Sequence, residues 1–230
     1  MSMRKLLVLG LLAAGCCGWA QTVSPVIVEY KAKAEGRISL VNNTLVPLAV
    51  VLEPKSFSIT PDGNGVYRDL DPEIHLKLSS MSFRIDPGQT YYVFYSATAD
   101  KLPAWFTVYA VFSKLQHAQG LDVRILLPHT VYIYPKKPLS KTSQVAFKNA
   151  VEYGGGKVVF DLTNSGPDLT RVREVKITSG SKSVASAGFP LLPGEERHVE
   201  VKWTEAEPPE TLELDFDHAT MKQPIHAGGQ

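Results

Sequence analysis

The segment that decides the fold reads Leu121-Asp122-Val123-Arg124-Ile125-Leu126-Leu127-Pro128-His129-Thr130-Val131-Tyr132-Ile133-Tyr134, followed by Pro135-Lys136-Lys137-Pro138. Side chains alternate between the two sides of an extended strand, so its first half is expected to be apolar on one face. That face carries Leu121, Val123, Ile125 and Leu127. The same alternation is typical of an ordinary core strand of a β-sandwich, so the pattern by itself leaves both interpretations open.

Short runs rich in β-branched and aromatic residues recur along the chain, and turn-forming residues separate them. Before the proline-lysine segment we expect strands at residues 26–28, 37–41, 48–52, 91–95, 105–112, 121–127 and 131–134. After it we expect strands at residues 144–148, 157–162, 173–177, 197–203 and 211–216. Few stretches show the spacing of an amphipathic helix. The sequence therefore predicts an all-β protein with two immunoglobulin-like β-sandwich domains in tandem.

The boundary between these domains is expected at residues 136–138, because two prolines around two lysines cannot continue a central strand. The N-terminal domain then covers residues 21–135 and the C-terminal domain residues 139–230. Each half has a strand that runs into an asparagine, Asn42 or Asn164, and a later Pro-Gly turn. These echoes predict two related sandwiches, with chance similarity between β domains as the alternative.

Residues 1–20 are typical of a secretory signal peptide. Arg4-Lys5 precedes a short apolar run, and small residues lead to a cleavage site after Ala20. The expected location is therefore the periplasm. Alternatively, residues 12–16 resemble a lipoprotein box, which would make Cys16 a lipid anchor. Both cysteines of the chain lie in this segment, so cleavage after Ala20 leaves none for a disulfide or for thiolate chemistry.

Composition excludes several classes of function. The formal net charge is +1 with no basic run, so nucleic acid is not expected as a partner. The six histidines are scattered without an HxH or HExxH pair, so no metal site is predicted. No glycine-rich phosphate loop or set of catalytic motifs is present, so we expect no cofactor and no enzymatic activity.

The order of elements in residues 37–138 resembles the N-terminal domain of the periplasmic chaperones of the chaperone–usher pilus pathway, the PapD-like family. The matching pieces are Val41-Asn42-Asn43, Ile85-Asp86-Pro87-Gly88, Lys101-Leu102-Pro103, Trp105-Phe106-Thr107-Val108-Tyr109, residues 121–127 and Tyr132-Ile133-Tyr134-Pro135. The second half, with Asn164 and Leu191-Leu192-Pro193-Gly194, is similar to the C-terminal domain of that family. Each motif is short, so the resemblance is to a divergent member.

This resemblance implies a periplasmic chaperone that binds and stabilises the incomplete immunoglobulin-like folds of fimbrial or pilus subunits by donor-strand complementation. Such a subunit lacks one strand, and the chaperone lends an alternating strand that fills the groove. The residues that match the lent strand are Leu121, Val123, Ile125 and Leu127. The implied partners are pilus-type subunits and an outer-membrane usher.

The resemblance fails at the basic residues with which the family holds a subunit's C-terminal carboxylate. The corresponding places read Ser24-Pro25-Val26 and His129-Thr130-Val131, and Arg124 lies several residues too early. His129 could donate to a carboxylate when protonated or could be a solvated loop histidine, so the carboxylate anchor is left unassigned. The alternative function is an exported structural or adhesive protein without chaperone activity, in which the apolar face of residues 121–127 is buried core.

Overall fold

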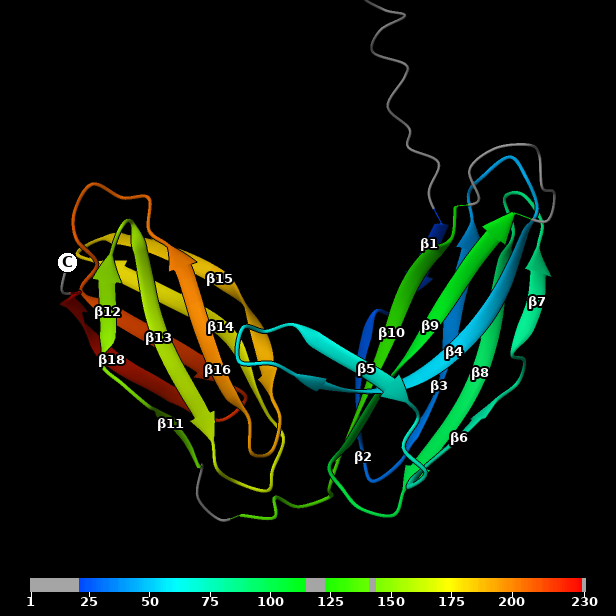
Figure 1. The fold of residues 1–230 in the computed structure, drawn as a ribbon, viewed down its shortest axis with the longest axis horizontal. Helices are drawn as coiled ribbons and strands as arrows, with labels where there is room; N and C mark the ends of the chain where they lie inside the picture. Colours follow the sequence, from blue (N-terminus) through cyan, green and yellow to red (C-terminus); the bar gives the residue numbers. More distant parts are fainter. Residues whose placement is uncertain (1–20, 115–122, 141–143, 229–230) are drawn as a thin grey trace, which may run out of the picture.

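The computed structural model describes residues 21–114, 123–140 and 144–228, and all of its regular elements are strands. Figure 1 shows two β lobes joined by the linker after β10. Among the described residues, no sheet takes strands from both sides of this linker. The prediction of an all-β fold with two sandwiches is therefore confirmed. No helix in these three ranges is long and apolar enough to cross a membrane.

The N-terminal lobe is built from two sheets that enclose one core. The first sheet has the order β1 (Gln21–Ser24), β3 (Ala34–Asn42), β8 (Thr90–Ala99) and β6 (Ile74–Leu78). The second has the order β2 (Ile27–Lys31), β10 (Ile125–Tyr134), β9 (Ala104–Lys114), β4 (Leu48–Ile59) and β5 (Gly65–Asp69), with β7 (Ser82–Ile85) paired to β4. Ile38 and Leu40 of β3 and Phe106 and Phe112 of β9 are almost fully buried between them, because alternate residues of each strand point inward.

The C-terminal lobe folds eight strands around a second core. The order is β11 (Val145–Phe147), β13 (Lys157–Asn164), β12 (Val151–Gly154), β18 (Thr220–Ala227), β17 (Thr211–Phe216), β14 (Thr170–Ser179) and β15 (Lys182–Leu191), with β16 (Glu196–Lys202) paired to β13. Strand β13 alternates between partly exposed and buried residues along its whole length, and Phe160 and Leu162 lie in the core with Trp203. The parallel pair of β12 and β18 joins the two layers.

Both lobes contain the same buried asparagine, at the end of β3 and at the end of β13. The main-chain N–H of Asn42 donates to the carbonyl of Gln89, and the N–H of Gly88 donates to the carbonyl of Asn42. Asn164 repeats this exchange with Glu195 and Gly194. Gly88 and Gly194 adopt φ of 72° and 73°, which favours glycine at these turns. The sequence echo between the two halves therefore corresponds to one structural motif present twice.

The side chain of Asn42 explains why asparagine is used in this motif. Its Nδ2 donates to the carbonyls of Val46 and Ile85 at 2.9 and 3.0 Å, and its Oδ1 accepts from the N–H of Thr44 at 2.9 Å. Few other side chains donate twice and accept at the same point. Asn164 likewise donates to the carbonyls of Asp168 and Leu191. Each asparagine thus ties the end of a strand to the following loop and to the Pro-Gly turn.

Replacing Asn42 with alanine is expected to lower the free energy of unfolding by about 2–4 kcal/mol, because the buried carbonyl of Ile85 loses its donor and the hydrogen bonds to the following loop are lost. Asn43→Ala is the matched control, since the neighbouring side chain is exposed, and it should change stability by less than ~0.5 kcal/mol. Urea denaturation followed by circular dichroism measures both. Equal effects of the two substitutions would contradict the structural role assigned to Asn42.

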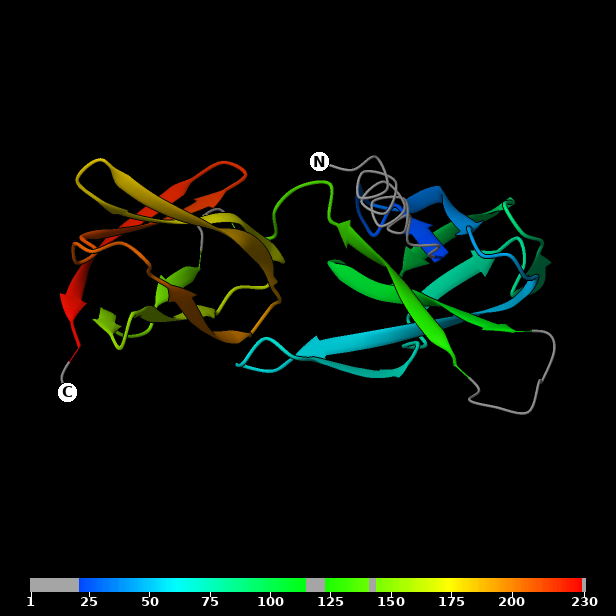
Figure 2. The same cartoon turned by 90° about the horizontal axis from the view of Figure 1, so that it is seen from above.

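The two lobes touch on both sides of the molecule. Phe57 and Tyr132 of the N-terminal lobe form a small apolar cluster with Leu169 and Leu192 of the C-terminal lobe. The tip of the β4–β5 hairpin also reaches the C-terminal lobe, where the carbonyl of Pro61 accepts a hydrogen bond of 2.8 Å from the main chain of β16. Figure 2 shows this hairpin and the linker on opposite sides. The linker, the apolar cluster and the hairpin contact therefore all connect the two lobes.

Candidate functional site

Strand β10 runs without interruption from Ile125 to Tyr134, which corrects the expectation of two strands at residues 121–127 and 131–134. Its antiparallel pairing with β9 continues from Ile125 opposite Phe112 to Ile133 opposite Ala104. Val123 and Arg124 precede the strand, and Leu121 lies outside the described residues. Pairing with β9 therefore continues through residues 128–130, which the sequence-based expectation placed between two strands.

Pro128 is tolerated because of the edge to which its nitrogen points. The N–H of Thr130 donates to the carbonyl of Val26, which places the N–H of residue 130 on the edge that faces β2. Because N–H directions alternate along a strand, the nitrogen of residue 128 points to the same edge. A proline there removes no hydrogen bond to β9, as is usual for prolines on a sheet edge.

Within the described residues, a partner strand pairs with this outer edge of β10 along only half of its length. Strand β2 pairs in parallel with Thr130 to Tyr134, beginning at Ile27 opposite Thr130. Strand β1 does not continue along β10 but pairs with β3 in the other sheet. Among the described residues, no strand pairs with the outer edge of residues 125–129. This stretch, which we name the open edge, is visible in Figure 1 as the upper part of β10 beside β1.

The predicted site residues differ in their exposure. Ile125 and Leu127 are partly buried and pack against the core of the N-terminal lobe. Val123 is 49% exposed just before the strand begins. Leu126 is 51% exposed and lies on the opposite face of β10. The apolar face is therefore neither sealed inside the lobe nor fully free, and its exposure increases toward residue 123.

The opposite face of the sheet carries an apolar patch that the sequence does not indicate. Leu126 lies opposite Val111 of β9, and Val111 lies opposite Val51 of β4. Leu126 and Val51 are exposed, and the ring of Tyr109 contacts the ring of Tyr67 at 5.2 Å on the same face. At the end of this face nearest the linker, Tyr132 packs with Leu169 and Leu192 of the C-terminal lobe. These residues are distant in sequence, and only the strand register brings them together.

His129 is fully buried at the end of the open edge, so its interpretation as a solvated loop histidine is wrong. Its Nδ1 donates to the carbonyl of Pro25 at 2.6 Å, and its ring packs edge-on against Tyr95 at 5.2 Å. Its Nε2 is buried and has no hydrogen-bond partner in the described part of the chain. Burial lowers the pKa of His129, and the bond to Pro25 opposes this only in part.

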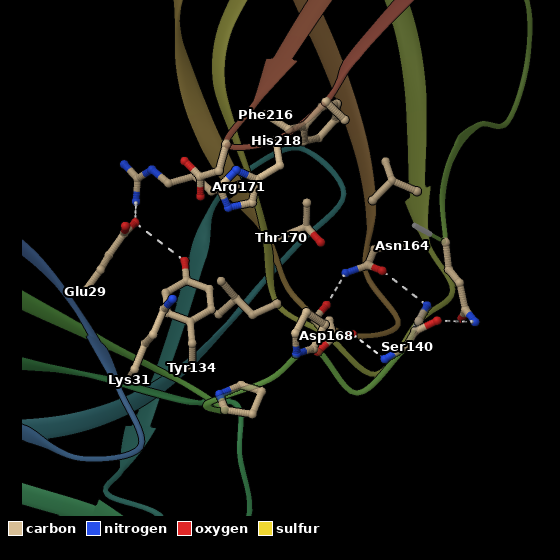
Figure 3. A pocket seen from close by; sticks show the side chains of 18 of the residues that line it. Glu29, Lys31, Tyr134, Ser140, Asn164, Asp168, Thr170, Arg171, Phe216 and His218 are labelled. Atoms are coloured by element: carbon tan, nitrogen blue, oxygen red, sulfur yellow. Dashed lines mark hydrogen bonds and ion pairs between the residues drawn. The ribbon is translucent and has the colours of Figure 1, made fainter. Parts of the chain in front are cut away.

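A pocket of about 810 Å³ lies between the lobes beside the linker. Figure 3 shows Glu29 of β2 and Asp168 of the C-terminal lobe among the side chains that line it. The Asp168 carboxylate accepts from the main-chain N–H groups of Leu139 and Ser140 at 2.9 and 2.8 Å, which fixes the linker to the C-terminal lobe. Acidic and basic groups both line this pocket, and its ionic contacts serve the junction of the lobes.

Glu29 connects the second lobe to β2. Arg173 donates to both carboxylate oxygens of Glu29, at 3.1 and 2.8 Å, and also to both oxygens of Asp217. Hydrogen bonds from Arg173 hold the pKa of Asp217 below its ordinary value. Arg171 lies 3.5 Å from Glu29 and faces the ring of Tyr132. These contacts attach β2, and with it the lower half of β10, to the C-terminal lobe.

Comparison with known proteins finds similar structures but no similar sequence family. No protein-family model and no curated protein matches the chain. The YadV chaperone superposes with a TM-score of 0.54 at 14% identity, over 89% of this chain and 98% of its own. The E. coli chaperone DraB superposes with a TM-score of 0.52 at 13% identity, over 90% of this chain and 98% of its own. A chain of the Salmonella enterica SafA pilin–SafB chaperone complex superposes with a TM-score of 0.55 at 13% identity, over 90% of this chain and 97% of its own.

This is the fold of the pilus chaperones. The match covers both lobes and the connection between them, so the fold implied by the sequence resemblance is confirmed. The low identity agrees with the divergence noted in the sequence. Each lobe of this chain has a buried asparagine, Asn42 or Asn164, whereas the two positions expected to hold a carboxylate have Ser24-Pro25-Val26 and a buried histidine.

Ile125 packs against the core whereas Val123 is exposed, so a charged residue at these two positions is expected to change stability by different amounts. Ile125→Asp should lower the free energy of unfolding by about 1–3 kcal/mol, because the carboxylate would replace a side chain packed against the core. Val123→Asp should change it by less than ~0.5 kcal/mol, because the side chain is exposed. Thermal denaturation of both variants measures the difference. An unchanged stability of Ile125→Asp would contradict its packing on the core.

Proposed function

We propose that this protein is a periplasmic chaperone for fimbrial or pilus-type subunits and that it binds them by lending the open edge of β10. The observation that carries the proposal is the combination of an unpaired strand edge with an apolar face at the same residues. Unpaired edges are templates for the addition of a strand from another chain. The pilus-chaperone fold supports the choice of partner, since the SafB chaperone occurs in complex with the SafA pilin.

The proposed contact has a main-chain part and a side-chain part. The N–H of Thr130 points to the outer edge of β10, and main-chain groups two residues apart on a strand point the same way. The N–H and carbonyl of Leu126 and the carbonyl of Pro128 therefore point to the open edge. A strand of the subunit would pair with these groups. Val123, Ile125 and Leu127 would then fill the groove left by the subunit's missing strand, with Leu121 as the further predicted member outside the described residues.

Burial of these side chains in the subunit's groove would supply only part of the binding free energy. Complete burial of one such aliphatic side chain contributes about 1.5–3 kcal/mol. Ile125 and Leu127 already pack partly on their own core, so their additional gain is smaller than that of exposed Val123. Ordering of the subunit strand and the loss of rigid-body freedom oppose binding. Main-chain pairing along the open edge is therefore needed in addition to apolar contact.

Export and assembly complete the proposal. Residues 1–20 serve as the signal peptide that brings the protein to the periplasm, and lipid anchoring through Cys16 is the alternative route. The function is non-enzymatic and consists of stabilising an incomplete β-sandwich until assembly, with an outer-membrane usher as the further partner. The subunit must be held without the family's basic anchor pair, because Ser24-Pro25-Val26 and His129-Thr130-Val131 contain no arginine or lysine.

The test is co-expression with a pilus-type subunit of immunoglobulin-like fold from the same genome, followed by purification from the periplasm through a tag on the chaperone. Val123→Asp should reduce the recovered subunit at least about tenfold, because a charge in an apolar groove costs more than the ~1.4 kcal/mol of a tenfold change. The variant itself should remain folded, since Val123 is exposed.

Leu126→Asp is the matched control, because Leu126 has nearly the same exposure on the opposite face of the strand. It should leave recovery of the subunit within about twofold of the wild type. Equal loss in both variants would indicate binding through the outer face of the sheet instead of strand donation. Recovery unaffected by Val123→Asp would contradict strand donation through this segment, whereas no recovery of the subunit by the wild type would favour the structural or adhesive alternative.

A further inference from the structure

We infer that His129 is a positioning residue that fixes where the open edge of β10 ends, by holding the start of β2 in place. This inference rests on the proposed function, because the open edge has a role only if a partner strand pairs there. The length of that edge determines how far a partner strand can extend along β10 before it meets β2.

The geometry at the boundary carries the inference. The covered half of β10 begins at Thr130, whose N–H donates to the carbonyl of Val26 at 2.7 Å. One residue earlier, Nδ1 of His129 donates to the carbonyl of Pro25 at 2.6 Å. Two consecutive residues of β10 therefore hold two consecutive carbonyls of the segment that enters β2. Val26 and Ile27 are themselves 52% and 45% exposed, so little apolar packing fixes this entry.

The protonation state of His129 follows from its partners. The Pro25 carbonyl can only accept, so Nδ1 carries the hydrogen in the neutral ring and Nε2 is left as an acceptor. Nε2 is buried without a partner among the described residues, so a second proton would create a buried cation with no counterion beside it. The ring is therefore held neutral, as a donor to Pro25 only.

The side chains that contact the His129 ring or its main chain are tyrosine and threonine, so the histidine is the group in this cluster that can be protonated in weak acid. The ring of Tyr95 from β8 packs against it, and the Tyr95 hydroxyl is hydrogen bonded to that of Tyr30 from β2. Burial raises the pKa of Tyr95, so it stays neutral. From β9, the hydroxyl of Thr107 contacts the main-chain carbonyl of His129.

The test measures amide hydrogen exchange in the free protein by NMR, at Thr130 and at Tyr132. Both amides point toward β2, because they are two residues apart on one strand. His129→Leu and His129→Met, which lack a donor, should accelerate exchange at Thr130 at least about tenfold relative to Tyr132. His129→Gln, whose amide can donate to Pro25, should restore the slower exchange at Thr130.

A pH series adds a readout that a purely structural role would not change. The pKa of His129 is lower in the folded protein than the ordinary histidine value of 6.5, so folding favours the neutral ring. The stability that the neutral ring contributes is therefore complete above pH 6.5 and is lost as the pH falls below that value. In the wild type, the exchange rate at Thr130 should therefore rise relative to that at Tyr132 on acidification, after correction for intrinsic exchange. His129→Gln should show no such change.

Each outcome decides between the alternatives. Equal acceleration at Thr130 and Tyr132, or failure of both apolar variants to fold while His129→Gln folds, would overturn the positioning role and leave His129 as a general stability residue. A ratio of exchange rates at Thr130 and Tyr132 that is the same in His129→Leu and His129→Met as in the wild type would also overturn the positioning role. These measurements need no subunit, so their failure differs from failure of the strand-donation proposal, which would show as undiminished recovery of the subunit by Val123→Asp.

Discussion

A β-strand has hydrogen-bonding groups on both edges, and in the part of the chain that the structure describes β10 has partner strands on both edges only from Thr130 to Ile133. Its inner edge pairs with β9 from Ile125 to Ile133. The outer edge of residues 125–129 has no partner strand among the described residues, because β1 has crossed to the other sheet. Pro128 lowers the number of unsatisfied donors there, since its nitrogen points outward and carries no hydrogen. This half-paired strand is the feature from which the proposed activity follows.

The rest of the molecule supports that edge from two directions. The core of the N-terminal lobe holds the inner face of β10, with Val131 and Ile133 fully buried. Glu29 ties β2 to Arg173 of the C-terminal lobe, so the strand that ends the open edge is also attached to the second lobe. The β4–β5 hairpin makes a further contact on the other side. The position of β2 is therefore tied to that of the C-terminal lobe.

Much of the fold could be predicted because alternation and turn chemistry are local. The strands around Trp105–Phe112 and residues 157–162 lie where the apolar pattern placed them, and Asn42 and Asn164 mark equivalent turns. Strands β1, β5 to β7, β12, β15 and β18 were not expected. Their exposed residues and proline or glycine content weaken the pattern, and pairing with neighbours distant in sequence makes them strands. The same reason explains why β10 continues through Pro128.

The sequence by itself determined the all-β class, the two lobes, the repeated asparagine turn and the apolar alternation at Val123, Ile125 and Leu127. Only the tertiary structure decided that the outer edge of β10 is paired from Thr130 onward, that His129 is buried against Pro25 and Tyr95, and that Leu126, Val111 and Val51 share one face. The physical reason is that alternation depends on neighbouring residues, whereas an edge, a burial or a patch depends on which distant strand the chain places alongside.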